Sequence, residues 1–239
     1  MTSTNAGDGA RNLTARVVGI AMISAIAIIV IANYGVSFRL IVPGDAAQTA
    51  RNIAQNAGLF RLNIGCDLLY AIDILIMLTG LYIILKPVNR GLAMMAALGR
   101  LIYAVMWGVT AFEMSGALRI LTDDLLPSVF ADNQLAAMAR LHLAGGYDAY
   151  YIGLPFWMLA SLICAYLWFR SRLVPRALAV YGMASSAWCL GCALAFIMVP
   201  DFKSIVGPSW YDMPAVLFEL ALGLWLVVKG LNAAEREPR

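Results

Sequence analysis

VVGIAMISAIAIIVIANYGVSF, residues 17–38, is a mostly apolar stretch that carries no charged side chain. The hydrocarbon core of a bilayer is about 30 Å thick, and about 20 apolar helical residues cross it. The stretch therefore predicts a transmembrane helix that begins soon after Arg11 and Arg16. A cleaved signal peptide is the alternative, but the stretch is longer than the apolar part of such a peptide, and no clean A-x-A cleavage pattern ends it.

Five more apolar stretches of similar character follow, at roughly 60–85, 92–113, 142–169, 177–199 and 213–230. Hydrophobic residues make up 62% of the 239-residue chain and charged residues 13%, with a mean hydropathy of +0.78. Soluble domains average about 45–50% apolar and about 25% charged residues. We therefore predict an all-α membrane protein, a single domain over residues 15–231 built as a bundle of six transmembrane helices. Polar tails are expected at 1–14 and 232–239.

Lysine and arginine in the loops predict the orientation of the spans, because cytoplasmic loops carry an excess of both. One side holds ten of the seventeen basic residues: Arg11, Arg16, Lys86, Arg90, Arg170, Arg172, Arg176, Lys229, Arg236 and Arg239. The opposite loops hold Arg39, Arg51, Arg119 and Lys203 together with six aspartates. Both termini are therefore expected in the cytoplasm. The net charge of +3, without a Lys/Arg-rich run, predicts the lipid bilayer as partner and no nucleic acid.

The first outer loop contains its own helix signal. Asp45 is suited to cap a helix, and Gln48 completes a capping-box pattern three residues later. The small and apolar side chains of Ala46, Ala50 and Ile53 fall on one helical face. A short amphipathic helix at the outer membrane interface is predicted here.

Ionisable residues inside the apolar stretches are costly in a bilayer, by about 2.5–3.5 kcal/mol each on insertion scales. They should therefore point into the bundle or into a wet cavity. Counting at about 1.5 Å per residue from the basic loop places Asp73 and Arg100 near mid-membrane on consecutive antiparallel helices. A buried ion pair between these two residues is predicted.

Three other acids, Asp67, Asp148 and Glu219, each lie about two turns below the outer boundary of a descending span. The segments RLNIGCDLLY (61–70) and HLAGGYDAYY (142–151) also match at Leu, Gly, Asp and Tyr with the same spacing. The expected result is an acidic outward-facing pocket for a cation or a small amphipathic ligand. Its ligand-binding residues are predicted to be Asp67, Asp148, Glu219, His142, Arg61, Glu113 and Tyr151. Three separate interhelical hydrogen bonds are the simpler alternative.

The cysteines and the histidine do not form a recognisable metal-binding or cofactor-binding motif. Of the four cysteines, Cys189 and Cys192 form a C-x-x-C without a second pair, and the chain holds a single histidine. Neither zinc nor two-histidine haem ligation fits this set, so no metal or cofactor is predicted. No G-x-S-x-G, H-E-x-x-H or phosphate-binding glycine loop occurs, and the sequence supplies no catalytic residues.

Several strings resemble a known family. LIVPGDA (40–46), LKPVNRGLA (85–93), LHLAGGYDAYYIG (141–153) and FELALGLWLVVKG (218–230), together with Arg100, are similar to the bacterial integral-membrane family catalogued as domain of unknown function 4386. The resemblance implies a multi-span protein of the bacterial cytoplasmic (inner) membrane and no particular activity. Members often read L-H-D where this chain has Leu141, His142 and Leu143, which removes one acidic neighbour of His142.

Three functions remain open at this point. The first is binding or transport of a small solute or cation through the acidic pocket. The second is a membrane-embedded enzyme acting on a lipid or isoprenoid near the outer leaflet, with His142 as general acid or base and a carboxylate from another span to orient it. The third is a structural or regulatory partner of another membrane protein.

Overall fold

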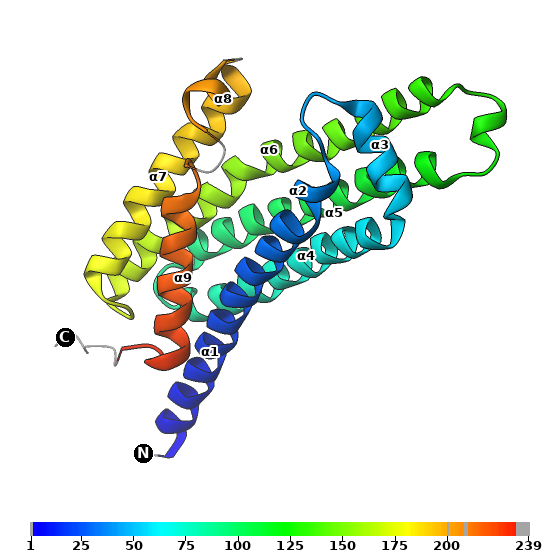
Figure 1. The fold of residues 1–239 in the computed structure, drawn as a ribbon. Helices are drawn as coiled ribbons and strands as arrows, with labels where there is room; N and C mark the ends of the chain where they lie inside the picture. The colour runs from blue at the N-terminus through cyan, green and yellow to red at the C-terminus, as the bar shows by residue number, and fades with distance from the viewer. Residues whose placement is uncertain (1, 200, 208–209, 233–239) are drawn as a thin grey trace. The chain divides into compact units, whose positions relative to one another are not determined.

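The fold was analysed in a computed structural model that describes residues 2–199, 201–207 and 210–232, with the side chains of 2–8 and 203–204 excluded. Within these ranges the chain is helical and has no β-strand (Figure 1). The elements are α1 (Thr2–Val30), a π-helix (Ile31–Ser37), α2 (Phe38–Leu40), α3 (Ala46–Gln55), α4 (Ala57–Leu85), α5 (Arg90–Thr122), a 3₁₀ turn (Leu126–Ser128), α6 (Asp132–Ser171), α7 (Arg176–Met198), α8 (Phe202–Ile205) and α9 (Met213–Val228).

Five of these helices are long and apolar enough to cross a membrane: Gly9–Leu40, α4, α5, α6 and α7. Their length and composition are those of a multi-pass membrane protein. The sixth expected span, 213–230, forms the apolar helix α9, which has 16 residues. At about 1.5 Å per residue α9 is about 24 Å long, shorter than the hydrocarbon core of about 30 Å.

Two helices extend well beyond the apolar stretches that predicted them. Helix α5 continues to Thr122, and α6 begins at Asp132 and runs unbroken through Pro155. Hydropathy indicates only the part of a helix that meets lipid. The end of α5 is set locally, where the Asp123 carboxylate accepts hydrogen bonds from the backbone N–H groups of Leu125 and Leu126. Likewise α1 begins at Thr2, inside the expected polar tail. The expected tail at 232–239 lies, from residue 233 on, outside the described residues.

The predicted short helix of the first outer loop is α3. The Asp45 carboxylate caps it by accepting a hydrogen bond from the backbone N–H of Gln48 at 2.8 Å. The Gln48 side chain does not return this bond as a capping box requires; its amide donates to Asn52 instead. Gly44 precedes the cap with φ +82°, a conformation that glycine adopts without strain.

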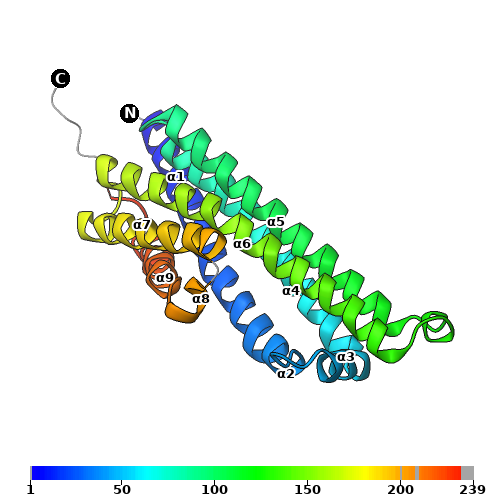
Figure 2. The same cartoon turned by 90° about the horizontal axis from the view of Figure 1, so that it is seen from above.

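The chain divides into two compact units. Unit 1 comprises residues 1–26, 73–103 and 153–239. Its helices α7 and α9 lie side by side (Figures 1 and 2). Close approach in this unit depends on glycine: a Cβ on Gly19 would lie 2.6 Å from the carbonyl oxygen of Gly223, and one on Gly182 would lie 2.4 Å from the Phe218 ring. Small residues at helix crossings are typical of membrane bundles.

Unit 2 comprises residues 27–72 and 104–152. Within it the segments of α5 and α6 lie side by side (Figure 2). Its apolar core draws on the π-helix, α2, α3, α4, α5 and α6, and its buried members are Val36, Leu40, Ile53, Phe60, Met114, Ala117, Leu118, Ala139 and Leu143. This core anchors the first outer loop and α3 to the long helices of the unit.

Candidate functional site

A buried ion pair lies at the centre of unit 1. Arg100 on α5 donates through Nη2 to Oε1 of Glu219 on α9 at 3.1 Å, and to the Ser161 hydroxyl at 3.2 Å. The indole N–H of Trp157 donates to the same Glu219 oxygen at 3.1 Å. The Trp157 ring stacks on Tyr103, with centroids 5.2 Å apart. Aromatic rings and neighbouring helices therefore seal this pair from solvent.

This pairing differs from the one predicted for Arg100. The prediction joined Arg100 to Asp73 because both lie at the same depth, whereas the structure joins it to Glu219. Asp73, on α4, accepts a hydrogen bond from the hydroxyl of Ser24 on α1. A neutral hydroxyl and a half-buried position satisfy this carboxylate without a cation.

The three acids of similar depth have three different surroundings. Glu219 belongs to unit 1, where it is engaged by Arg100 and Trp157. Asp67 and Asp148 belong to unit 2, and there Asp67 is buried whereas Asp148 is exposed. The three acids thus lie at a similar depth along their helices but have different contacts. The single acidic pocket expected from that depth would draw on both units, and it stays a prediction.

Asp67 has a short polar chain beside it. The hydroxyl of Ser37, the last residue of the π-helix, donates to Oδ1 of Asn63 at 3.1 Å. The Asn63 amide in turn lies 3.5 Å from Oδ2 of Asp67. The sequence prediction missed both residues. The i, i+4 spacing of Asn63 and Asp67 on one helix was a usable signal, but nothing in the sequence pointed to Ser37.

The structure brings together Glu113 and His142, both predicted to rim the pocket. Oε2 of Glu113 on α5 lies 2.6 Å from Nδ1 of His142 on α6. Two glycines make room for this contact: a Cβ on Gly116 would lie 2.7 Å from the His142 ring, and one on Gly145 would lie 3.2 Å from the Glu113 carboxyl. The arrangement fits a carboxylate that orients an imidazole.

The remaining two predicted residues do not join this pair. Arg61 is exposed on α4. Tyr151 packs by a ring edge against Tyr150 at 5.3 Å, and Tyr150 packs similarly against Trp107. Trp107 also contacts Tyr70 edge to face, so these four rings form a continuous aromatic cluster in unit 2.

A cavity of about 180 Å³ lies in unit 2 between residues 41–50, which include the start of α3, and the helices α5 and α6. Most of its surface is apolar. The charged or hydroxyl-bearing side chains that line it are Asp45, Thr49, Arg140 and Tyr147, and its remaining lining residues are Ile41, Val42, Pro43, Gly44, Ala46, Ala50, Leu121, Ala136, Ala139, Leu143 and Ala144. The predicted ligand-binding residues are not among them, although Tyr147 is a direct neighbour of Asp148.

The family resemblance was tested over the whole chain. Residues 17–230 match the family described as "Domain of unknown function (DUF4386)". The chain belongs to this family. No curated protein and no solved structure matched. Membership accounts for the apolar helices and supplies no activity, so the function has to be argued from the cavity and the polar contacts described above.

Proposed function

We propose that this chain is a protein of the bacterial cytoplasmic membrane that binds a small amphipathic solute with an anionic group in the cavity of unit 2. The cavity itself carries the proposal, because it combines an apolar lining with the guanidinium of Arg140. Ligand sites are typically concave and mostly apolar, with few polar groups that orient the ligand. The proposal keeps the solute-binding function expected from the sequence and changes the charge of the ligand.

The charge of the ligand follows from the lining. Asp45 already uses its carboxylate to cap α3 through Gln48. Arg140 is the cationic side chain of the lining, and guanidinium binds carboxylates and phosphates with two parallel hydrogen bonds. The Leu121 and Leu143 side chains offer apolar surface for a tail. The volume lies below the range of about 300–1,000 Å³ common for drug-sized ligands, so a short-chain solute is expected.

Binding is tested with a pair of ligands that differ in the sign of the charge. Full-length protein in lipid nanodiscs is titrated with octanoate and with octylamine, and the thermal unfolding midpoint is followed. Octanoate should raise the midpoint and octylamine should not. Arg140→Gln should abolish the octanoate effect. Arg119→Gln, at an arginine that is also exposed but does not line the cavity, is the matched control and should retain it. Equal stabilisation by both ligands would reject charge recognition.

We place six spans in this membrane, with both termini in the cytoplasm. The loop charges support this orientation, and α9 supports a sixth crossing if its flanking residues extend into the interface. The four native cysteines are buried, so single introduced cysteines report cleanly. In intact cells a membrane-impermeant maleimide should label Arg51→Cys and leave Arg90→Cys and Lys229→Cys unlabelled. Labelling of Lys229→Cys would reduce the count to five spans.

One observation favours a second candidate, an enzyme acting on a lipid or isoprenoid. The sequence hypothesis required a carboxylate within reach of His142, and Glu113 lies 2.6 Å from it. This geometry is that of an oriented general base. The test is turnover of lipid or isoprenoid substrates by the purified protein. His142→Gln and Glu113→Gln should each abolish turnover, while Arg140→Gln should not.

A further inference from the structure

The Asp67 carboxyl is the most deeply buried acid of unit 2. Its residue is 4% exposed, on a helix that is apolar enough to cross the membrane. The contact to its Oδ2 comes from the Asn63 amide at 3.5 Å, which is long for a hydrogen bond. A carboxylate ion in such a place would be held by one weak, neutral donor.

The side chains described around Asp67 do not offset the cost of burying its carboxylate as an ion. Arg100 is paired with Glu219 and His142 with Glu113, so the basic partners in these two salt bridges are engaged by other acids. Two titratable groups that interact electrostatically with Asp67 are Cys66 on its own helix and Tyr147 on α6. A thiol and a phenol are both uncharged near neutral pH. An isolated buried carboxylate is very unfavourable in this setting, and a group so placed takes up a proton instead.

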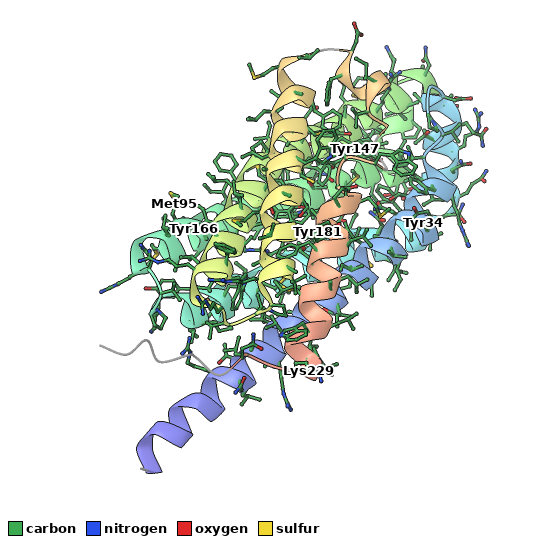
Figure 3. All side chains as sticks on the ribbon, turned by 90° about the vertical axis from the view of Figure 1, so that its left-hand side faces the viewer. Tyr34, Met95, Tyr147, Tyr166, Tyr181 and Lys229 are labelled. Carbon is green, nitrogen blue, oxygen red and sulfur yellow. The ribbon has the colours of Figure 1, made fainter. Side chains whose placement is uncertain are left out.

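We infer that Asp67 is a proton-binding site inside the membrane span, occupied by a proton in the state that the structure shows. Release breaks the O–H bond of the neutral acid, leaves the electron pair on the carboxylate, and passes the proton to water. Tyr147, labelled in Figure 3, lies near enough to Asp67 to be affected by its charge, lines the cavity and is 44% exposed, so we expect the proton to leave toward the cavity. Proton binding at Asp67 is therefore expected to affect the cavity.

The π-helix connects the Asp67 site to the loop that lines the cavity. Ser37 ends the π-helix and donates to Asn63, the residue that contacts Asp67. Loss of the proton turns Asp67 into a strong acceptor and draws the Asn63 amide toward it. The Ser37 contact then has to adjust. π-Helical turns inside α-helices are frequent at functional sites, and this one is the segment of the chain that leads into the cavity loop at residue 41.

Infrared spectroscopy of the full chain in lipid tests the inference directly, because a protonated carboxyl has a carbonyl stretch distinct from that of a carboxylate. Wild-type protein at neutral pH should show a protonated-carboxyl band that shifts in D₂O and disappears on alkalinisation. Asp67→Asn should lose this band. Asp148→Asn, at an exposed acid one helix away in the same unit, should retain it. Absence of the band from folded wild-type protein, or its persistence in Asp67→Asn, would overturn the inference.

If Asp67→Asn does not fold, a second variant tests whether the protonated-carboxyl band belongs to Asp67. Asn63→Ala keeps the acid and removes its amide contact, so the protonated-carboxyl band should persist at a shifted frequency. An unshifted band would show that the signal belongs to another carboxyl. Neither readout depends on the solute proposed for the cavity, so failure of solute binding and failure of proton binding are distinguished.

Discussion

Two ion pairs among the described residues join helices in the same way but in opposite surroundings. In unit 1 the side chains of Arg100 and Glu219 are 3% and 9% exposed, whereas in unit 2 those of His142 and Glu113 are 36% and 26% exposed. Bulky aromatic side chains close the first pair, and glycines border the second. A sealed pair is held in one geometry, while an exposed pair between small residues remains accessible to protons and ligands. The sealed pair and the accessible pair thus lie in different units of the chain.

The largest effect is expected when the sealed pair is broken. Glu219→Gln leaves the Arg100 guanidinium buried beside a neutral amide, and loss of one partner of a buried pair costs about 3–5 kcal/mol. The free energy of unfolding, measured by reversible denaturation in lipid–detergent mixtures, should fall by this amount. Exchange of both partners, Arg100→Met with Glu219→Leu, should restore most of the stability, because an apolar pair of similar volume is often neutral or stabilising. A single-variant loss below about 1 kcal/mol would refute the structural role.

A smaller effect is expected from filling the space beside the exposed pair. A Cβ in Gly116→Ala would lie 2.7 Å from Nδ1 of His142, so the imidazole has to move away from Glu113. Overpacking of this kind costs about 1–3 kcal/mol. Gly108→Ala is the control on the same helix, since a Cβ there meets no atom within 4 Å. That control should be neutral or stabilise by up to about 1 kcal/mol. Equal effects of the two variants would show that the glycine at 116 is not required for the pair.

Removal of the exposed pair itself should cost less than either change above. His142→Gln leaves Glu113 partly exposed, and pairs in such positions contribute about 0–1 kcal/mol. The loss should shrink further at high salt, because ions screen exposed charges. Unfolding free energies at low and high ionic strength measure both effects. A loss as large as that of Glu219→Gln would contradict the distinction between the two pairs.

Sequence reasoning predicted the helices better than it predicted the partners of their polar side chains. Helical hydropathy places a residue along the membrane normal, and that was sufficient to identify Arg100 as a buried charge. It does not say which way a side chain faces around its helix or which helices are neighbours. Arg100 was therefore assigned to an acid on the preceding helix, whereas its partner Glu219 comes from α9, 119 residues later. The pairing of Asp73 with Ser24 was missed for the same reason.

The segment around Asp45 shows the same difference between features that a local pattern predicts and features that depend on long-range packing. The cap at Asp45 is encoded within four residues, and the sequence predicted α3 from it. The cavity depends on where that loop packs against α6, which no local pattern records. Arg140 became a candidate binding residue only when the loop was placed beside it. The pocket expected from the common depth of the acids stays a prediction, because Glu219 belongs to a different unit from Asp67 and Asp148.

The smallest effect is expected at Asp212, which immediately precedes α9 and is partly buried. Burial raises the pKa of this carboxyl above its ordinary value. The folded state thus binds the proton more tightly than the unfolded state. Its contribution to stability is present at low pH and is lost as the pH rises from the ordinary value through the raised pKa, the opposite of an acid held by a cation. Asp212→Asn should reduce this pH dependence of the thermal unfolding midpoint, whereas Asp132→Asn, at an exposed acid, should leave it intact. An unchanged profile in Asp212→Asn would show that the α9 terminus is solvated in the membrane-bound protein.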